Sequence, residues 1–365
     1  MQESSTARPV LSMSWLGRLG RFGNQLFQYA FLRICARNGG ASVQCRGWAG
    51  ETLFGLQDER VGQVLPPAIE GEEPGRGPLD IVPEGILYME RRAGAKSRRV
   101  GPGALEHGLA GVNLFGFFQF HTRHYRPYRD YISSLYCPVP DLEKDLRGGL
   151  DRLRSRGKTV VGIHLRRGDF FEAARLAFAV VFPAEWYARW LESVWDELED
   201  PVLLVCSDDL ESVLPAFEKF CPVTSRDLDV VLPERMRGQG VDFYVDFWLL
   251  SQCDLVAISN GSFGITACLL SERAREFVRP SPALDGTLVS FDPWDCEPIL
   301  WFGSDRSQWI KSLGGAVWTT WRTLGAWGAL KCLCWHYPMG WLKHAAVRAY
   351  FRWKLYRMSA PMDAS

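Results

Sequence analysis

The sequence predicts an α/β protein built on parallel sheets that helices cover on both faces. Strand-like apolar runs alternate with helical stretches through the second half of the chain, and three of these runs end in polar clusters. Ligands bind at the carboxyl ends of strands in such sheets, so the polar endings predict a binding site. The length of 365 residues gives room for two domains or one large one.

The first half of the chain contains fewer clear elements. Residues 1–11 are predicted to be a loose leader, and residues 20–36 pass from a glycine-rich turn into a helix with one apolar side. Residues 62–104 are rich in Gly, Pro, Glu and Arg, which predicts loops over the surface. The apolar run 112–120 predicts a buried strand, and the charged segment 141–156 predicts a helix that connects two halves.

The second half repeats one pattern three times. Its predicted strands cover residues 160–165, 202–206 and 255–258, and its predicted helices cover residues 184–197, 209–219 and 241–253. The strands end in the polar segments 164–169, 207–209 and 259–263. Brought to one edge of a sheet, these segments would form a crevice of the size of a nucleotide.

The segment His164-Leu165-Arg166-Arg167-Gly168-Asp169 predicts an anion site. Two guanidiniums at a strand end are costly unless an anion pairs with them, and a phosphate matches their planar donors. The alternative is a structural ion-pair cluster in which Asp169 neutralises an arginine. Because side chains alternate along a strand, we expect one arginine to hold phosphate and the other to support the loop.

Three further segments suit a nucleotide, and each has a structural alternative. Residues 20–25 open a helix whose first amides favour an anion, or they form an ordinary tight turn. Ser207-Asp208-Asp209 is typical of a helix cap, although a carboxylate there is also able to accept two donors from a guanine edge. Residues 259–263 offer hydroxyls and amides to phosphate, or they cap the next helix.

No metal site is predicted. Asp227-Leu228-Asp229 has a pattern that can chelate a metal next to a diphosphate, but this pattern is frequent by chance and the arginine pair already supplies positive charge. His121 and His124 have a spacing that suits zinc, but the sequence shows no third ligand. We interpret both histidines as loop residues near the acceptor side.

Composition indicates a folded cytoplasmic protein, with 47% hydrophobic and 23% charged residues. Its ten cysteines are scattered, several of them in apolar segments, which favours reduced thiols over a disulfide framework. The sequence shows no signal peptide, and no uncharged apolar run reaches the roughly 18 residues that a membrane span requires.

Five blocks of the sequence resemble, in their order, those of the family 11 glycosyltransferases, which are the α-1,2-fucosyltransferases. The wider group of α-1,2-, α-1,6- and protein O-fucosyltransferases shares them in part. The blocks are GRFGNQLFQYA (20–30), GFFQFHTRHY (116–125), GIHLRRGDF (162–170), LLVCSDD (203–209) and DFWLLSQCDLVAISNGSF (246–263). They span most of residues 17–270.

The resemblance implies a GT-B fold, in which two Rossmann-like domains face each other across a cleft. It implies an acceptor-side domain over residues 1–150 and a GDP-sugar-binding domain over residues 151–305, which leaves a helical extension at 306–365. The implied activity is inverting, metal-independent transfer of fucose from GDP-fucose to a galactose-type hydroxyl of a glycan. No cofactor is expected.

The resemblance also implies roles for individual residues. Arg166 would bind the β-phosphate and stabilise the departing GDP. His164 would line the diphosphate pocket, and Asp208 would read guanine. The other residues expected to bind the donor or to support its site are Gly23, Asn24, Arg167, Ser262 and Phe263. Asp169 is a candidate for the base that takes the acceptor proton, although its place beside the arginines favours an orienting role.

One departure from the family pattern leaves two alternatives open. Gly264-Ile265-Thr266 stands where the family usually has a serine and two tryptophans. The alternatives are a transferase of the same fold that uses another GDP-sugar, and a GDP-sugar-binding protein without catalysis. The intact set of His164, Arg166 and Asp169 argues against the second.

The C-terminal tail differs in charge from the body of the chain. Residues 301–357 hold eight tryptophans, and residues 306–362 hold nine Lys or Arg and no Asp or Glu. Residues 1–305 contain 33 basic against 41 acidic residues, so nucleic acid is not expected as a partner. Tryptophan with basic side chains suits the surface of an anionic membrane. We therefore expect a peripheral protein at the inner face of a bacterial membrane, acting on a lipid-linked glycan. The alternative is a tail helix that packs on the N-terminal domain.

Overall fold

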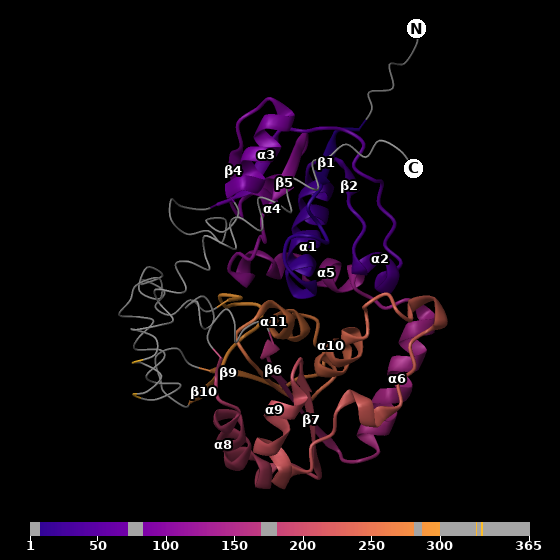
Figure 1. Cartoon of the computed structure of the whole chain (residues 1–365), viewed down its shortest axis with the longest axis vertical. Helices are drawn as coiled ribbons and strands as arrows, with labels where there is room; N and C mark the ends of the chain where they lie inside the picture. The colour runs from indigo at the N-terminus through magenta and orange to yellow at the C-terminus, as the bar shows by residue number, and fades with distance from the viewer. Residues whose placement is uncertain are drawn as a thin grey trace. The chain divides into compact units, whose positions relative to one another are not determined.

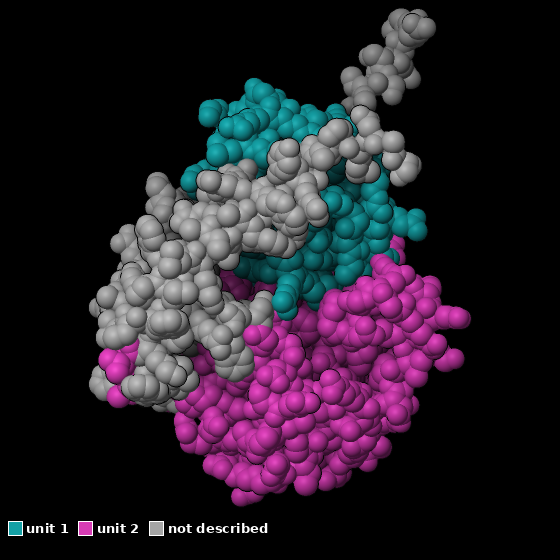
Figure 2. Space-filling model, in the orientation of Figure 1, with its two compact units in different colours: residues 1–51, 56–120, 339–365 teal, residues 52–55, 121–338 magenta. Residues whose placement is uncertain are grey.

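The computed structural model describes residues 8–71, 83–168, 181–280 and 287–299, together with residues 326 and 330 (Figure 1). These residues form two compact units (Figure 2). Each unit is built around its own five-stranded sheet. The first unit contains described residues up to 51 and from 56 to 120, and the second contains residues 52–55 and those from 121 onward. The chain passes from the first unit to the second after Phe120. The domain bounds at residues 150 and 305 stay a prediction.

The first unit holds an all-parallel sheet in the order β2-β1-β5-β3-β4. Its strands are β1 (Val10–Met13), β2 (Ser42–Cys45), β3 (Pro67–Glu70), β4 (Arg98–Val100) and β5 (Val112–Phe115). Its helices are α1 (Phe22–Asn38), α3 (Pro83–Ala93) and α4 (Ala104–His107), and α2 (Ala49–Phe54) begins in this unit. The predicted helix at 20–36 corresponds to α1, which packs on β1 and β2.

Residues 62–104 contain β3, α3 and β4, so the prediction of surface loops there was wrong. β3 is buried at every position, and Met89 of α3 packs on the core residue Phe115. β3 has only four residues, and the surrounding Gly and Pro residues hide the helical pattern of α3.

β5 ends at Phe115, before the predicted end at residue 120. The carboxylate of Glu70, at the end of β3, accepts hydrogen bonds from the amides of Phe117 (2.7 Å) and Gln119 (3.2 Å), which turns the chain. Phe118 adopts a positive φ of 53° in this turn, and its ring stacks on Phe31 of α1 at 4.2 Å. The apolar run 112–120 therefore forms a buried turn as well as a strand.

The second unit holds a sheet in the order β10-β9-β8-β6-β7, parallel except for its edge strand β10. Its strands are β6 (Thr159–Leu165), β7 (Pro201–Ser207), β8 (Leu255–Ile258), β9 (Glu276–Pro280) and β10 (Leu288–Ser290). Its α-helices are α5 (Arg129–Leu135), α6 (Pro140–Arg154), α8 (Ala184–Val194), α9 (Leu210–Val213), α10 (Phe243–Ser251) and α11 (Ser262–Leu269). The 3₁₀ helices are η2 (Thr122–His124), η3 (Arg126–Tyr128), η4 (Trp195–Glu197), η5 (Leu214–Phe220), η6 (Ser225–Leu228) and η7 (Glu234–Met236).

The repeating strand–helix pattern predicted for this half is confirmed. β6, β7 and β8 lie within one residue of their predicted bounds, and β6 is buried at every position between its two neighbours. The predicted helix at 209–219 is instead a short α9 that continues as the 3₁₀ helix η5. Pro215 explains the change, since it has no N–H to continue the α-helical bonding.

Candidate active site

Three polar strand ends meet at one edge of the second sheet, as the sequence predicts. His164 of β6 is paired in register with Cys206 of β7 and Ile258 of β8, so the residues that follow each strand lie together. The amide of Arg166 donates a hydrogen bond to the hydroxyl of Ser259 at 2.9 Å, which joins two of these ends directly. This edge of the sheet is the candidate active site.

Asp208 holds the arginine pair in place. One of its carboxylate oxygens lies 2.7 Å from Nη1 of Arg166, and the other accepts the amide of Arg167 at 2.7 Å. A Cβ at Gly168 would lie 2.5 Å from Asp208 Oδ2, so only glycine fits this close approach. In this structure the Asp208 carboxylate thus orients the two arginines.

The two arginines differ in their surroundings. The Arg166 side chain is 16% exposed, whereas Arg167 is buried and donates from Nη1 to the backbone carbonyl of Arg166 at 3.1 Å. Burial lowers the pKa of Arg167. Arg166 is therefore the more accessible of the two guanidiniums, and Arg167 braces the loop that carries it.

His164 is a buried, neutral imidazole. Its ring stacks on that of Phe263 with 4.7 Å between the centroids. Burial, and then the charges of Arg166 and Arg167, lower the pKa of His164 to about 3. Its Nδ1 has no hydrogen-bond partner within the described residues. A buried polar atom without a partner is unusual, and it marks this ring as a candidate ligand contact.

The start of α11 approaches His164 closely. A Cβ at Gly264 would lie 2.9 Å from the Ile258 side chain and 3.3 Å from His164 Nδ1, which explains the glycine after the Ser-Phe pair. No side chain caps the first turn, where Ser262 and Phe263 lie. Amides at a helix start attract anions, so this turn can hold a phosphate beside His164.

The interpretation of residues 207–209 as a helix cap holds for Asp209. The Asp209 carboxylate accepts the amide of Ser212 at 3.3 Å and so caps α9, while the Ser207 hydroxyl accepts the amide of Asp209 at 3.1 Å. Asp208 takes no part in this cap.

Sequence reasoning missed a second carboxylate, that of Asp246 in α10. Its backbone carbonyl lies 3.8 Å from the sulfur of Cys206, close to the end of β7. Burial raises the pKa of this carboxyl, which also hydrogen-bonds Ser225, and its Oδ1 has no partner among the described residues. The detectable signal is an aspartate within the otherwise apolar helix Phe243–Ser251, of which seven residues are buried.

The predicted donor residues of the first unit lie in a fixed turn. Gly20 has a φ of +77°, and a Cβ there would lie 2.6 Å from Asn24 Nδ2. Asn24 Oδ1 accepts a hydrogen bond from Gln119 Nε2 at 2.7 Å, and the neighbouring Gly23 is buried. Gln28 donates to the carbonyls of Leu19 and Gly116, which ties this turn to the end of β5.

Comparison with known proteins finds similarity to one family. Residues 112–280 match the model of glycosyl transferase family 11. This match covers just under half of the chain. The match confirms the resemblance seen in the five sequence blocks.

Two proteins similar to this chain have curated names. It is 26% identical over 264 residues to galactoside alpha-(1,2)-fucosyltransferase 1 of Leontocebus fuscicollis, which covers 69% of the chain and 64% of the relative. It is 26% identical over 281 residues to galactoside alpha-(1,2)-fucosyltransferase 2 of Sus scrofa, which covers 73% of the chain and 72% of the relative.

The fold is similar to that of the fucosyltransferase NodZ from Bradyrhizobium. That crystal structure superposes with a TM-score of 0.50 at 15% identity, over 79% of this chain and 99% of NodZ. The predicted GT-B-type α/β class is thereby confirmed.

The Asp227-Leu228-Asp229 segment forms a local turn. Asp227 accepts hydrogen bonds from both the amide (2.8 Å) and the hydroxyl (2.7 Å) of Thr224, in a capping box that starts η6. Asp229 ends that helix with a left-handed backbone. Within the described ranges, no three His, Cys, Asp or Glu side chains gather as a metal site would require.

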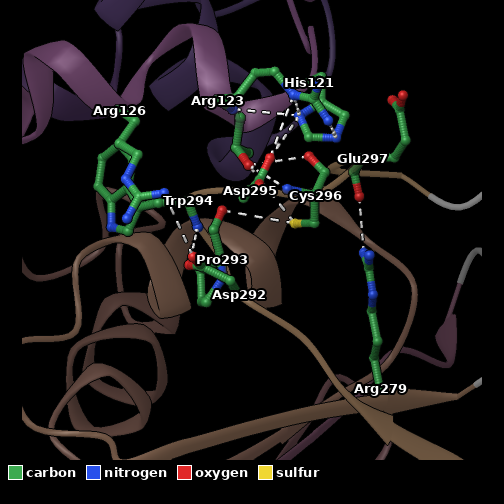
Figure 3. Close-up of polar contacts among 11 residues, drawn as sticks. His121, Arg123, Arg126, Arg279, Asp292, Pro293, Trp294, Asp295, Cys296 and Glu297 are labelled. Atoms are coloured by element: carbon green, nitrogen blue, oxygen red, sulfur yellow. Dashed lines mark hydrogen bonds and ion pairs between the residues drawn. The ribbon is translucent and has the colours of Figure 1, made fainter.

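His121 belongs to a polar cluster that joins residues 121–126 to residues 292–297 (Figure 3). Its Nδ1 accepts a hydrogen bond from Arg123 Nε at 3.0 Å and lies 3.8 Å from Asp295 Oδ1. Beside it, the Thr122 amide donates to the carbonyl of Cys296 at 2.9 Å. The cluster fastens the chain that follows β10 to the start of the second unit.

Two predictions fall outside the described residues. They concern Asp169 as a base or orienting residue and, apart from residues 326 and 330, the 306–365 tail as a helical, membrane-binding extension. Among the helices of the described part, none combines the length and apolar character that a membrane span requires.

Proposed function

We propose that this chain transfers fucose from GDP-fucose to a hydroxyl of a glycan. The observation that carries the proposal is the arrangement at the end of β6, where Arg166, the neutral ring of His164 and the start of α11 share one sheet edge. The family match and the names of the chain's relatives support the same reaction.

Departure of GDP is the step that this edge can assist. Negative charge builds on the diphosphate as the bond to the sugar breaks, and a fixed guanidinium stabilises that charge. We place the β-phosphate at Arg166 and its oxygens near the first amides of α11, at Ser262 and Phe263. One such contact lowers the activation barrier by about 3 kcal/mol. Asp208 and Arg167 hold Arg166 in position beforehand.

We assign guanine recognition to Asp246 in place of the predicted Asp208. A guanine edge presents two N–H donors, and a carboxylate can accept both. Asp208 is already bonded to the two arginines, whereas Asp246 has a buried oxygen without a described partner. This difference makes Asp246 the better candidate.

The finer features of the reaction are also proposals. The names of the relatives support a galactose-type acceptor and α-1,2 linkage, although the chain spans only 64% of the first relative's length. Inversion follows from direct attack of the acceptor hydroxyl on the anomeric carbon. Because Arg166 supplies positive charge at the diphosphate, we propose that the reaction needs no metal.

A donor panel tests this function. The full chain is incubated with lactose and either GDP-fucose, GDP-mannose or UDP-galactose, and nucleotide release is measured. We expect release from GDP-fucose alone, dependent on lactose. Turnover of another GDP-sugar would support the second candidate, which is favoured by Gly264-Ile265-Thr266 in place of the usual serine and tryptophans.

A further inference from the structure

Two arginines lie together at the carboxyl edge of the first sheet, outside the site described above. Arg18 belongs to the turn between β1 and α1, and Arg46 directly follows β2. These two strands are parallel neighbours whose last residues, Met13 and Cys45, are paired in register. Both arginines are exposed.

A glycine contact brings the two loops together. Gly17 has a φ of +77°, and a Cβ at this position would lie 2.7 Å from the carbonyl oxygen of Gly47. Gly17 directly precedes Arg18, and Gly47 directly follows Arg46. Backbone packing therefore fixes the separation of the two loops that carry the arginines, since no larger residue fits at Gly17.

Three acidic groups lie around the end of β2, and each has a hydrogen-bond partner, which for Glu59 is Gln44 Nε2 at 3.1 Å. Asp58 contacts Arg33 Nη1 and the Tyr29 hydroxyl at 2.7 and 2.6 Å, and Glu51 binds Arg60 through both carboxylate oxygens. In the part of the chain that the structure describes, no carboxylate pairs with Arg18 or Arg46. Partial burial, and then repulsion by Arg46, lower the pKa of Arg18.

Aromatic side chains lie on the same side of the first unit. Trp15, Tyr88 and Phe117 are partly buried against the core cluster that contains Leu19 and Phe115. Tyr88 interacts electrostatically with Arg18, and its hydroxyl accepts a hydrogen bond from Arg92 Nη1 at 3.3 Å. Large rings with a polar tip and an exposed face are typical of ligand-binding surfaces.

We propose that Arg18 and Arg46 bind a carboxylate or phosphate of the acceptor, so that the acceptor is an acidic saccharide. This inference rests on the proposed function and on the acceptor-side domain that the family resemblance implies for residues 1–150. An oxyanion between the guanidiniums relieves their mutual repulsion and matches their planar donors. Trp15 and Tyr88 offer an apolar surface to the attached sugar ring.

Calorimetric binding of three probes to the full chain tests the proposal. The probes are lactose, a glucuronic acid–galactose disaccharide and lactose phosphate. We expect both acidic probes to bind about tenfold more tightly than lactose. This ratio of affinities should fall as salt is added. A preference for the carboxylate or the phosphate probe supports the proposal either way and assigns the anion.

Matched variants separate this surface from general charge effects. The double variant Arg18→Gln/Arg46→Gln should bind the acidic probes about tenfold more weakly and lactose as before, whereas Arg18→Lys/Arg46→Lys should retain part of the preference. Arg98→Gln, which changes an exposed arginine of β4, should behave as the unaltered protein. Circular dichroism confirms that each variant is folded.

Equal affinity for lactose and the acidic probes would overturn the inference, as would a preference that survives the double Gln variant. GDP-fucose binding is measured in the same samples. If GDP-fucose binds and the acidic preference is missing, only the inference fails. If GDP-fucose does not bind, the proposed function fails, and the acidic preference still decides whether Arg18 and Arg46 form an anion site.

Discussion

Arg166 is the residue on which the proposed chemistry depends most. Its guanidinium is held by Asp208, its amide is bonded to Ser259, and its carbonyl accepts from Arg167. A side chain fixed in this way needs little reorganisation when charge develops beside it, which is the condition for electrostatic catalysis.

Replacing Arg166 with Ala should lower kcat on the order of 10²- to 10³-fold, because a charge that stabilises the leaving group is removed. The measurement is GDP release at saturating GDP-fucose and lactose. Arg166→Lys should recover part of the rate, since it restores the charge without the planar donors. A full rate in Arg166→Ala would contradict the assignment, and a protein that only binds GDP-sugars would show no turnover to lose.

His164 should make stability dependent on pH. Its pKa is about 3 when folded and about 6.5 in an unfolded chain, so the folded state binds fewer protons between these values. Its contribution is therefore complete above about pH 6.5 and is lost as the pH falls toward 3. Between pH 7 and pH 5 this loss is about 2 kcal/mol.

Urea unfolding at pH 7 and pH 5 measures this effect. The free energy of unfolding should fall by about 2 kcal/mol more in the unaltered protein than in His164→Gln, which lacks the titrating group. The comparison removes the effects of other titrating groups, because they are present in both proteins. The same pH dependence in both would show that His164 is not held neutral.

Asp246 and Asp208 should respond differently to the same substitution. Asp246→Asn should weaken GDP binding roughly tenfold or more, because one of the two oxygens proposed to accept hydrogen bonds from guanine becomes a donor. Asp208→Asn should reduce kcat more than GDP affinity, since it loosens Arg166. Calorimetry with GDP and the rate of GDP release distinguish the two effects. Reversed phenotypes would return guanine recognition to Asp208.

At the scale of elements, glycines determine how closely loops and helices approach the strands. Gly168, Gly264 and Gly20 each stand where a Cβ would contact a neighbour at 2.5–2.9 Å. The neighbours of Gly168 and Gly264 belong to the candidate site, and the neighbour of Gly20 is Asn24, a predicted donor residue of the first unit. These approaches bring α11 beside His164 and place Asn24 in its turn.

The variant Gly20→Ala should destabilise the protein by about 1–3 kcal/mol, because it combines a positive φ with a clash against Asn24. The control is Gly103→Ala, at a right-handed position with no atom within 4 Å of the added Cβ. It should change stability by less than about 0.5 kcal/mol. Urea unfolding measures both variants, and equal effects would show that the turn tolerates a side chain.

At the scale of the molecule, charge is divided along the sequence between an acidic body and a basic tail. We propose that the 306–365 tail binds anionic membrane surfaces through its cations and tryptophans. Deleting residues 306–365 should abolish sedimentation with anionic liposomes while the remainder still binds GDP. Unchanged sedimentation would show that the tail is not the membrane-binding part, and binding of both forms to neutral liposomes would argue against a charge effect.

The sequence predicted the central strands of the second unit well, because β6 and β8 are continuous apolar runs followed by polar residues. It predicted the meeting of Arg166, Asp208 and Ser259 for the same reason, since parallel strands place their carboxyl ends at one edge. The prediction failed at residues 62–104, because strands as short as β3 and β4 show too little periodicity to be recognised. Asp246 was missed because a helical pattern does not show which neighbour a side chain faces.

Local sequence thus determined the α/β class, the strand ends and the residue types at the candidate site, since these depend on hydrophobic pattern and on a few glycines. The partners of each charge depended on the folded chain. Asp208 engages both arginines, Glu51 and Asp58 engage Arg60 and Arg33, and no described carboxylate pairs with Arg18 and Arg46. Ion pairs form between residues far apart in sequence, so only tertiary packing decides which cations remain available for a ligand.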